Sequence, residues 1–265
     1  MRSLLEAFNK TKQAMVSGDI IMTKEELRQS WDEFELNHFD QIMDYTHCLS
    51  IYFEQLPRAE TTFIALMIMN CHTLAVDKYL ALGAPLAKID AKYFGMLSRC
   101  FSDVEMEYYR HLYNLWIPNC HEGRVLKQSM SSIPITRQFI WADWRNVNVG
   151  MSSLAKLVLM LNYPDEDLDI ALVSSTIVYT SIQCGLLNDV GSVIKDKGST
   201  EVNYYIEVAP EKSESQENIY KASIRHLAML DIPSNIKLVL KSAVDGSYLL
   251  YGLSKRYFGK SEPNW

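Results

Sequence analysis

Three oxygen-bearing side chains recur at four-residue steps in the second half of the chain. Asn188, Ser192 and Asp196 stand in the run LNDVGSVIKD. On a helix, steps of four keep these side chains within about 80° of one face. Amide, hydroxyl and carboxylate oxygens are the hard ligands that Mg²⁺ prefers, and Mg²⁺ commonly completes its coordination with water and substrate phosphates. The spacing is compatible with a site for magnesium and phosphate or with an ordinary polar helix end.

A candidate phosphate ligand lies forty-three residues before Asn188. Arg145 stands in the run FIWADWRNVNVG, which ends at Gly150. A guanidinium stays charged and can bind two phosphate oxygens at once. Glycine tolerates backbone conformations that interrupt a helix, so Gly150 permits a break there. Taken alone, Arg145 would be expected in a surface salt bridge.

These motifs resemble those of the class I terpene synthases. The second metal-binding motif of that family is matched at Asn188, Asp189, Val190, Ser192 and Lys195. Asp196 stands where the family usually has glutamate, one methylene longer. The resemblance implies that Asn188, Ser192 and Asp196 bind metal.

The resemblance extends to residues that bind diphosphate. Arg145 resembles the diphosphate-sensing arginine, and Asn148 and Val149 fall at the linker and effector positions, whose backbone turns toward the substrate. An Arg-Tyr pair near the C-terminus resembles the closing pair of the family. The diphosphate ligands implied by the resemblance are Arg145, Lys195, Arg256 and Tyr257.

The first metal site of the family departs from its usual pattern here. The expected window reads NCHTLAVDKYL, in which Asp77 is the one acidic residue and Lys78 replaces the second acid of the usual pair. We expect Asp77 to bind metal and to face Asn188 across the mouth of a helical bundle. Up to three Mg²⁺ ions are implied, or fewer if the first motif is depleted.

The resemblance implies an enzyme that ionises a prenyl diphosphate with Mg²⁺, steers the carbocation to a terpene and releases diphosphate. Arg145 and Asp77 are then catalytic. The expected cavity residues are Trp141, Val149 and Tyr179, with Phe63 and Tyr251 as further aromatic candidates. Two alternatives stay open: a prenyltransferase or squalene-synthase-like enzyme, and a non-catalytic helical interaction protein derived from this family.

Composition and periodicity describe the protein that must position these residues. The chain has 265 residues, 48% of them hydrophobic, and a formal charge of −6, which disfavours general binding to nucleic acids or anionic membranes. No linker-like stretch divides it, so one domain over residues 1–265 is expected. The N-terminal residues form no signal-peptide core, which predicts a cytoplasmic protein. A homodimer is among the expected assemblies.

Apolar residues recur at three- and four-residue steps, which predicts an all-α bundle. The predicted helices lie near residues 24–36, 38–55, 60–82, 87–114, 134–146, 149–162, 166–195, 215–230 and 234–258. Six prolines, Pro118 among them, are expected between helices. The apolar run Ile170–Leu187 contains too many hydroxyl groups for a membrane span and predicts a buried central helix. The polar stretch Lys195–Glu217 predicts a mobile loop.

The five cysteines predict reduced thiols, because their number is odd and they lie far apart. Three of them adjoin a histidine: His47-Cys48, Cys71-His72 and Cys120-His121. Neighbouring residues on a helix diverge by about 100°, and no regular ligand spacing links the pairs. A zinc site is therefore disfavoured.

Overall fold

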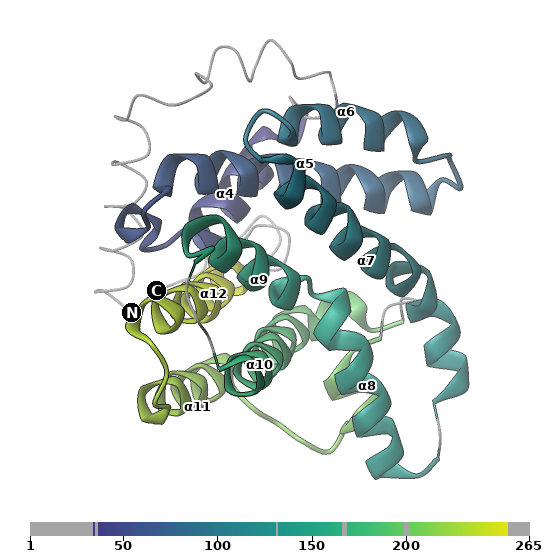
Figure 1. Cartoon of the computed structure of the whole chain (residues 1–265). Coiled ribbons are helices and arrows are strands. Elements are labelled where there is room, and N and C mark those ends of the chain that lie inside the picture. The colour runs from purple at the N-terminus through teal and green to yellow at the C-terminus, as the bar shows by residue number, and fades with distance from the viewer. Residues whose placement is uncertain (1–33, 35–36, 131, 166–168, 199–201, 254–265) are drawn as a thin grey trace.

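The computed structural model describes Phe34 and residues 37–130, 132–165, 169–198 and 202–253. Within these ranges every regular element is helical and no strand occurs, which confirms the all-α class (Figure 1). Most of the predicted helix 24–36 lies outside the described residues. The elements are α4 (Phe39–Leu49), η1 (Phe53–Gln55), α5 (Ala59–Ala81), α6 (Ala87–Leu97), α7 (Asp103–Ser129), α8 (Pro134–Asn148), α9 (Met151–Asn162), α10 (Ile170–Asp196), η2 (Tyr204–Val208), α11 (Gln216–Met229) and α12 (Ser234–Leu253).

The single helix predicted over 87–114 is two helices, α6 and α7. Ser102 ends the connection between them with a capping box, in which its side chain and that of Glu105 bond each other's backbone N–H groups. This pair starts a new helix because it satisfies two N–H groups that have no partner at a helix start. Pro118 lies inside α7, so its predicted place between helices was wrong. Helical contacts on either side of Pro118 outweigh the one backbone hydrogen bond that proline removes.

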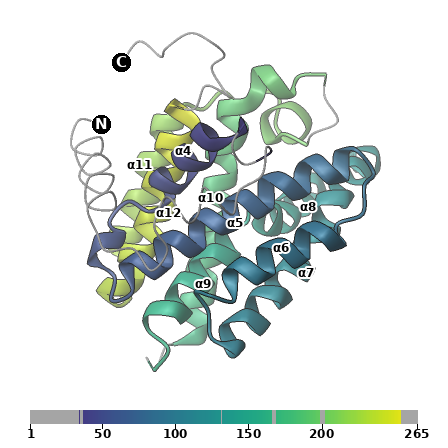
Figure 2. The same cartoon turned by 90° about the horizontal axis from the view of Figure 1, so that it is seen from above.

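Helix α10 runs through the middle of the bundle and packs against α8, α9, α11, α12 and η2 (Figure 2). It follows the predicted span and buries eleven of its residues. Among the described residues, α5 and α10 are the helices long and apolar enough to cross a membrane by length and composition alone. Both also pack within the bundle, as core helices do.

The stretch Lys195–Glu217 was predicted to be a loop, but its described part holds the π-helical turn η2. Val202, Asn203 and Val208 are buried. Two of these are apolar and pack against Trp141 and Trp144 of α8. The prediction failed because composition alone does not show that a polar stretch contains a few residues that cover neighbouring helices.

Helices α4 and α12, far apart in the sequence, lie against each other (Figure 1). Gly246 makes the contact close: a Cβ atom there would overlap the carbonyl oxygen of Cys48. Ser242, one turn earlier, donates a hydrogen bond to the carbonyl oxygen of Leu49 at 3.1 Å. The approach of the two backbones therefore depends on small residues along one face of α12.

Candidate functional site

A buried ion pair joins α8 to the metal-motif helix α10. Nη2 of Arg145 bonds Oδ1 of Asp189, and these side chains are 6% and 0% exposed. Gly185, one turn before Asp189, leaves room for the arginine, because a Cβ there would lie 2.5 Å from Cγ of Arg145. Nη1 of Arg145 donates to Oδ1 of Asn148 at 2.7 Å. The guanidinium therefore links the predicted metal motif to the end of α8.

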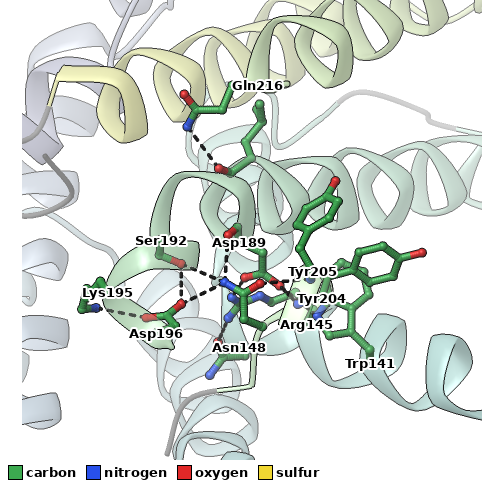
Figure 3. Close-up of polar contacts among 12 residues, drawn as sticks. Trp141, Arg145, Asn148, Asp189, Ser192, Lys195, Asp196, Tyr204, Tyr205 and Gln216 are labelled. Atoms are coloured by element: carbon green, nitrogen blue, oxygen red, sulfur yellow. Dashed lines mark hydrogen bonds and ion pairs between the residues drawn. The ribbon is translucent and has the colours of Figure 1, made fainter. Parts of the chain in front are cut away.

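Asp189 accepts two further hydrogen bonds at its second oxygen. The donors are the indole N–H of Trp141 at 3.0 Å and the backbone N–H of Tyr204 at 2.8 Å (Figure 3). Trp141 was expected to line a cavity, but it lies beside Asp189, 2% exposed and packed among Trp144, Val202 and Val208. An indole N–H needs a partner when buried, and the carboxylate supplies it.

The predicted metal ligands Ser192 and Asp196 lie in contact, since the hydroxyl of Ser192 donates to Oδ2 of Asp196. The side-chain N–H₂ of Asn203 lies between them, 3.2 Å from the hydroxyl and 3.0 Å from the carboxylate. Asn203 is fully buried and also donates to the carbonyl oxygen of Asp189 at 2.8 Å. We call Arg145, Asp189, Ser192, Asp196 and Asn203 the α10 cluster.

The hydroxyl of Ser192 and the carboxylate of Asp196 are ligands that suit Mg²⁺. Their present partner is the side-chain amide of Asn203, a hydrogen-bond donor that occupies the place of a cation. The N–H groups of Asn203 point at the oxygens that would face a cation. Among the described residues, no three His, Cys, Asp or Glu side chains form a group that could hold a metal. The residues fit Mg²⁺ if Asn203 withdraws and if water or phosphate completes the coordination.

Two of the remaining predicted ligands, Asn188 and Lys195, lie on α10 beside this site, whereas Asp77 lies on another helix, α5. Asn188 is half-buried on α10, one turn before Ser192, and Nζ of Lys195 lies 3.8 Å from Oδ1 of Asp196. Asp77 is exposed on α5, seven residues after Asn70 and four after Thr73. These intervals place Asp77 on the face of α5 that carries Asn70 and Thr73.

That face of α5 borders a cavity of about 170 Å³. Its wall comes from α4, α5, α7, α9 and α12 and from the break between α8 and α9. The break is the segment Asn148–Gly150, in which Gly150 has a φ of 73°. The indole N–H of Trp116 fixes the break by donating to the carbonyl oxygen of Asn148 at 3.1 Å. The cavity is lined mainly by Tyr45, Leu49, Leu66, Met69, Asn70, His72, Thr73, Tyr109, Leu112, Tyr113, Trp116, Asn148, Val149, Met151, Leu154, Leu250 and Tyr251.

Of the five expected cavity residues, two line this cavity and three, Trp141 among them, do not. Val149 and Tyr251 belong to the wall. Tyr179 instead packs against His226 of α11, with 4.0 Å between ring centroids. Phe63 lies in the core beside His47. Helical periodicity does not distinguish a core aromatic residue from one that lines a cavity, so these assignments required the packing.

His72, a buried histidine at the wall of the cavity, was missed as a site residue, because in the sequence it was considered only with Cys71 as a zinc ligand. Nε2 of His72 lies 3.0 Å from Oδ1 of Asp90, and Nδ1 lies 3.0 Å from the hydroxyl of Tyr109. Tyr113 donates to the same Asp90 oxygen at 2.5 Å. Burial lowers the pKa of His72, and Asp90 opposes that effect. We call these four residues the His72 cluster.

The sequence held one weak signal for this cluster. Tyr109 and Tyr113 are four residues apart and therefore share a face of α7. Asp90 comes from α6 and His72 from α5, so their meeting depends on how three helices pack. Burial also raises the pKa values of both tyrosines, so their hydroxyl groups stay protonated.

Arg256 and Tyr257, the predicted closing pair, lie outside the described residues. No protein-family model, curated protein or solved structure matches this chain. The functional argument therefore depends on the motifs and on the geometry around them.

Proposed function

We propose that this protein is an enzyme of the class I terpene synthase type, which ionises a prenyl diphosphate and shields the resulting carbocation. The contact between Arg145 and Asn148 carries the proposal. It connects a guanidinium, which can bind phosphate, to a helix break whose residues line an apolar cavity. Diphosphate binding at Arg145 would thereby be transmitted to the cavity wall.

Departure of diphosphate requires cationic groups, because negative charge develops on its oxygens. Arg145 would give up part of its bonding to Asp189 and bind phosphate oxygens instead. Lys195, which directly precedes Asp196 on α10, would supply a second positive charge. Asn188, Ser192 and Asp196 would hold Mg²⁺, and Asp77 of α5 would be the ligand of the first metal site that the resemblance implies. When bound, Mg²⁺ supplies positive charge that stabilises the leaving group.

The cavity suits the organic part of such a substrate. Tyr109, Tyr113, Trp116 and Tyr251 place aromatic rings in a wall that is otherwise mostly aliphatic. Aromatic faces stabilise cations, and exclusion of water protects a carbocation from capture. The small cavity volume, about 170 Å³, favours a short prenyl chain.

One observation favours the non-catalytic alternative. Asn203 already satisfies Ser192 and Asp196, and Asp189 already accepts bonds from Arg145, Trp141 and Tyr204. A helical protein that had lost catalysis could retain such a closed polar network as part of its core. Diphosphate release separates the two functions, because the non-catalytic protein would release none.

The proposed function is tested by incubating the purified full chain with Mg²⁺ and C10, C15 and C20 prenyl diphosphates. Released diphosphate and hydrocarbon products are measured. Arg145→Lys keeps the charge beside Asp189 but loses the planar fork, so we expect turnover to fall about 10²-fold. Arg225→Lys, at an exposed arginine of α11, is the matched control and should retain turnover. Absence of diphosphate release by the wild-type protein with every substrate would reject the proposal.

A further inference from the structure

The His72 cluster has an order of hydrogen bonds that its chemistry fixes. An ionised carboxylate can only accept, so Nε2 of His72 carries a proton and donates it to Asp90, 3.0 Å away. Nδ1 must then accept, and the Tyr109 hydroxyl, also 3.0 Å away, is its donor. The result is a chain from Tyr109 through a neutral imidazole to a carboxylate.

This chain has the general form of a base oriented by a third group, as in catalytic triads. His72 is held rigidly, because its ring stacks on Tyr93 and Tyr113 with centroids 5.0 and 4.6 Å away. Tyr109 and His72 both line the cavity, whereas Asp90 does not.

We propose that Tyr109 and His72 form a proton relay that ends the reaction by deprotonating the carbocation to an alkene, an inference that rests on the proposed function. A C–H bond next to the cationic carbon breaks, and its electron pair forms the new C=C bond. The proton adds to the oxygen of Tyr109 while the original hydroxyl proton of Tyr109 passes to Nδ1 of His72.

After this step Tyr109 is neutral again and His72 carries the positive charge. Asp90 stabilises that imidazolium across its 3.0 Å hydrogen bond. Return of the proton to water after product release restores the neutral relay. Tyr109 is thus the catalytic group that touches the cation, and Asp90 is a positioning residue that acts through His72.

The relay is tested by measuring the ratio of alkene to alcohol product for the wild-type protein and for its variants. Tyr109→Phe keeps the ring but removes the oxygen, so water captures more of the cation. We expect alkene formation to fall at least about twentyfold and diphosphate release to fall much less. Asp90→Asn keeps the shape and should lower alkene formation in the same direction by a smaller factor.

Tyr108→Phe is the matched control, because Tyr108 is the neighbouring tyrosine and lies outside the cavity wall. An unchanged share of alkene in both Tyr109→Phe and Asp90→Asn, with diphosphate still released, would overturn the relay and leave the proposed function standing. A wild-type protein that releases no diphosphate would reject both.

A measurement on the free protein tests the same relay without turnover. Nitrogen NMR of ¹⁵N-labelled histidine, assigned with His72→Gln, should show a neutral imidazole protonated on Nε2. Tyr109→Phe should shift the Nδ1 resonance, because that nitrogen loses its donor. Protonation of His72 on Nδ1 in the wild-type protein would contradict the direction of the relay.

Discussion

The α10 cluster and the His72 cluster are both buried polar networks, yet they differ in charge and in position. The α10 cluster contains a buried ion pair and lies under η2, whereas the His72 cluster centres on a neutral imidazole at the cavity wall. A buried charge is costly without its partner, so the first network is tightly coupled to folding. His72 itself is neutral, so a rearrangement of its hydrogen bonds separates no pair of opposite charges. The α10 cluster is therefore suited to stabilising a charged leaving group, and the His72 cluster to transferring a proton.

The largest expected effect separates the structural and chemical roles of Arg145. Arg145→Met should lower the free energy of unfolding by about 3–5 kcal/mol, because it leaves the fully buried Asp189 carboxylate without its cation. The double variant Arg145→Met/Asp189→Leu removes both charges and should recover most of that loss. Turnover should remain lost in both variants. Urea unfolding and diphosphate release are the measurements.

If the double variant recovers turnover together with stability, Arg145 has no role in chemistry. Its burial against Asp189 makes it a structural residue in either case.

A smaller effect is expected at Asn203, which competes with a cation in the α10 cluster. Asn203→Ala should destabilise the protein by about 1–3 kcal/mol, because Ser192 and Asp196 lose a shared donor. Mg²⁺ should then bind more tightly and raise the unfolding temperature more than in the wild-type protein. Thermal unfolding across a magnesium titration measures this.

Asn218→Ala, at an exposed asparagine of α11, controls for loss of an amide. Adding Asp196→Ala to Asn203→Ala should abolish the magnesium effect. Equal magnesium shifts in the wild-type protein and Asn203→Ala would show that Asn203 does not occupy the cation position.

The smallest effect is a pH dependence confined to the His72 cluster. Burial lowers the folded-state pKa of His72, so below about pH 6.5 the unfolded chain binds more protons than the folded one. Stability is therefore retained above about pH 6.5 and lost as pH falls toward the folded-state pKa. The slope is at most about 1.4 kcal/mol per pH unit. The titratable groups that contact His72 include Asp90, Tyr93, Tyr109 and Tyr113.

His72→Gln should remove this part of the pH dependence. The measurement is the free energy of unfolding in urea of the wild-type protein and of His72→Gln, from pH 7.5 to 5. Identical slopes for both proteins would mean that His72 binds its proton equally well folded and unfolded. That result would remove the contrast between a cluster built on an ion pair and one built on a neutral imidazole.

The sequence predicted most of the helices, but not the direct contact of Arg145 with Asp189 or the partners of the other site residues. Steps of three and four define a helix locally, so α5, α8 and α10 could be located from the sequence. Asn203 and Asp90 could not be assigned, because their roles arise where separate helices pack. Trp141 and Tyr179 do not line the cavity described above, and packing decides that as well.

The contact of Gly246 with the backbone of Cys48 has a consequence for biosynthesis. Helix α4 is synthesised early, but its partner α12 is synthesised only after about two hundred more residues. Until then, the surface of α4 that packs against α12 is uncovered. At about 5–20 residues per second, that interval lasts roughly 10–40 seconds. During it, the apolar surface of α4 that later meets α12 is available to chaperones. A slowed ribosome late in the coding sequence would prolong this exposure more than one early in it.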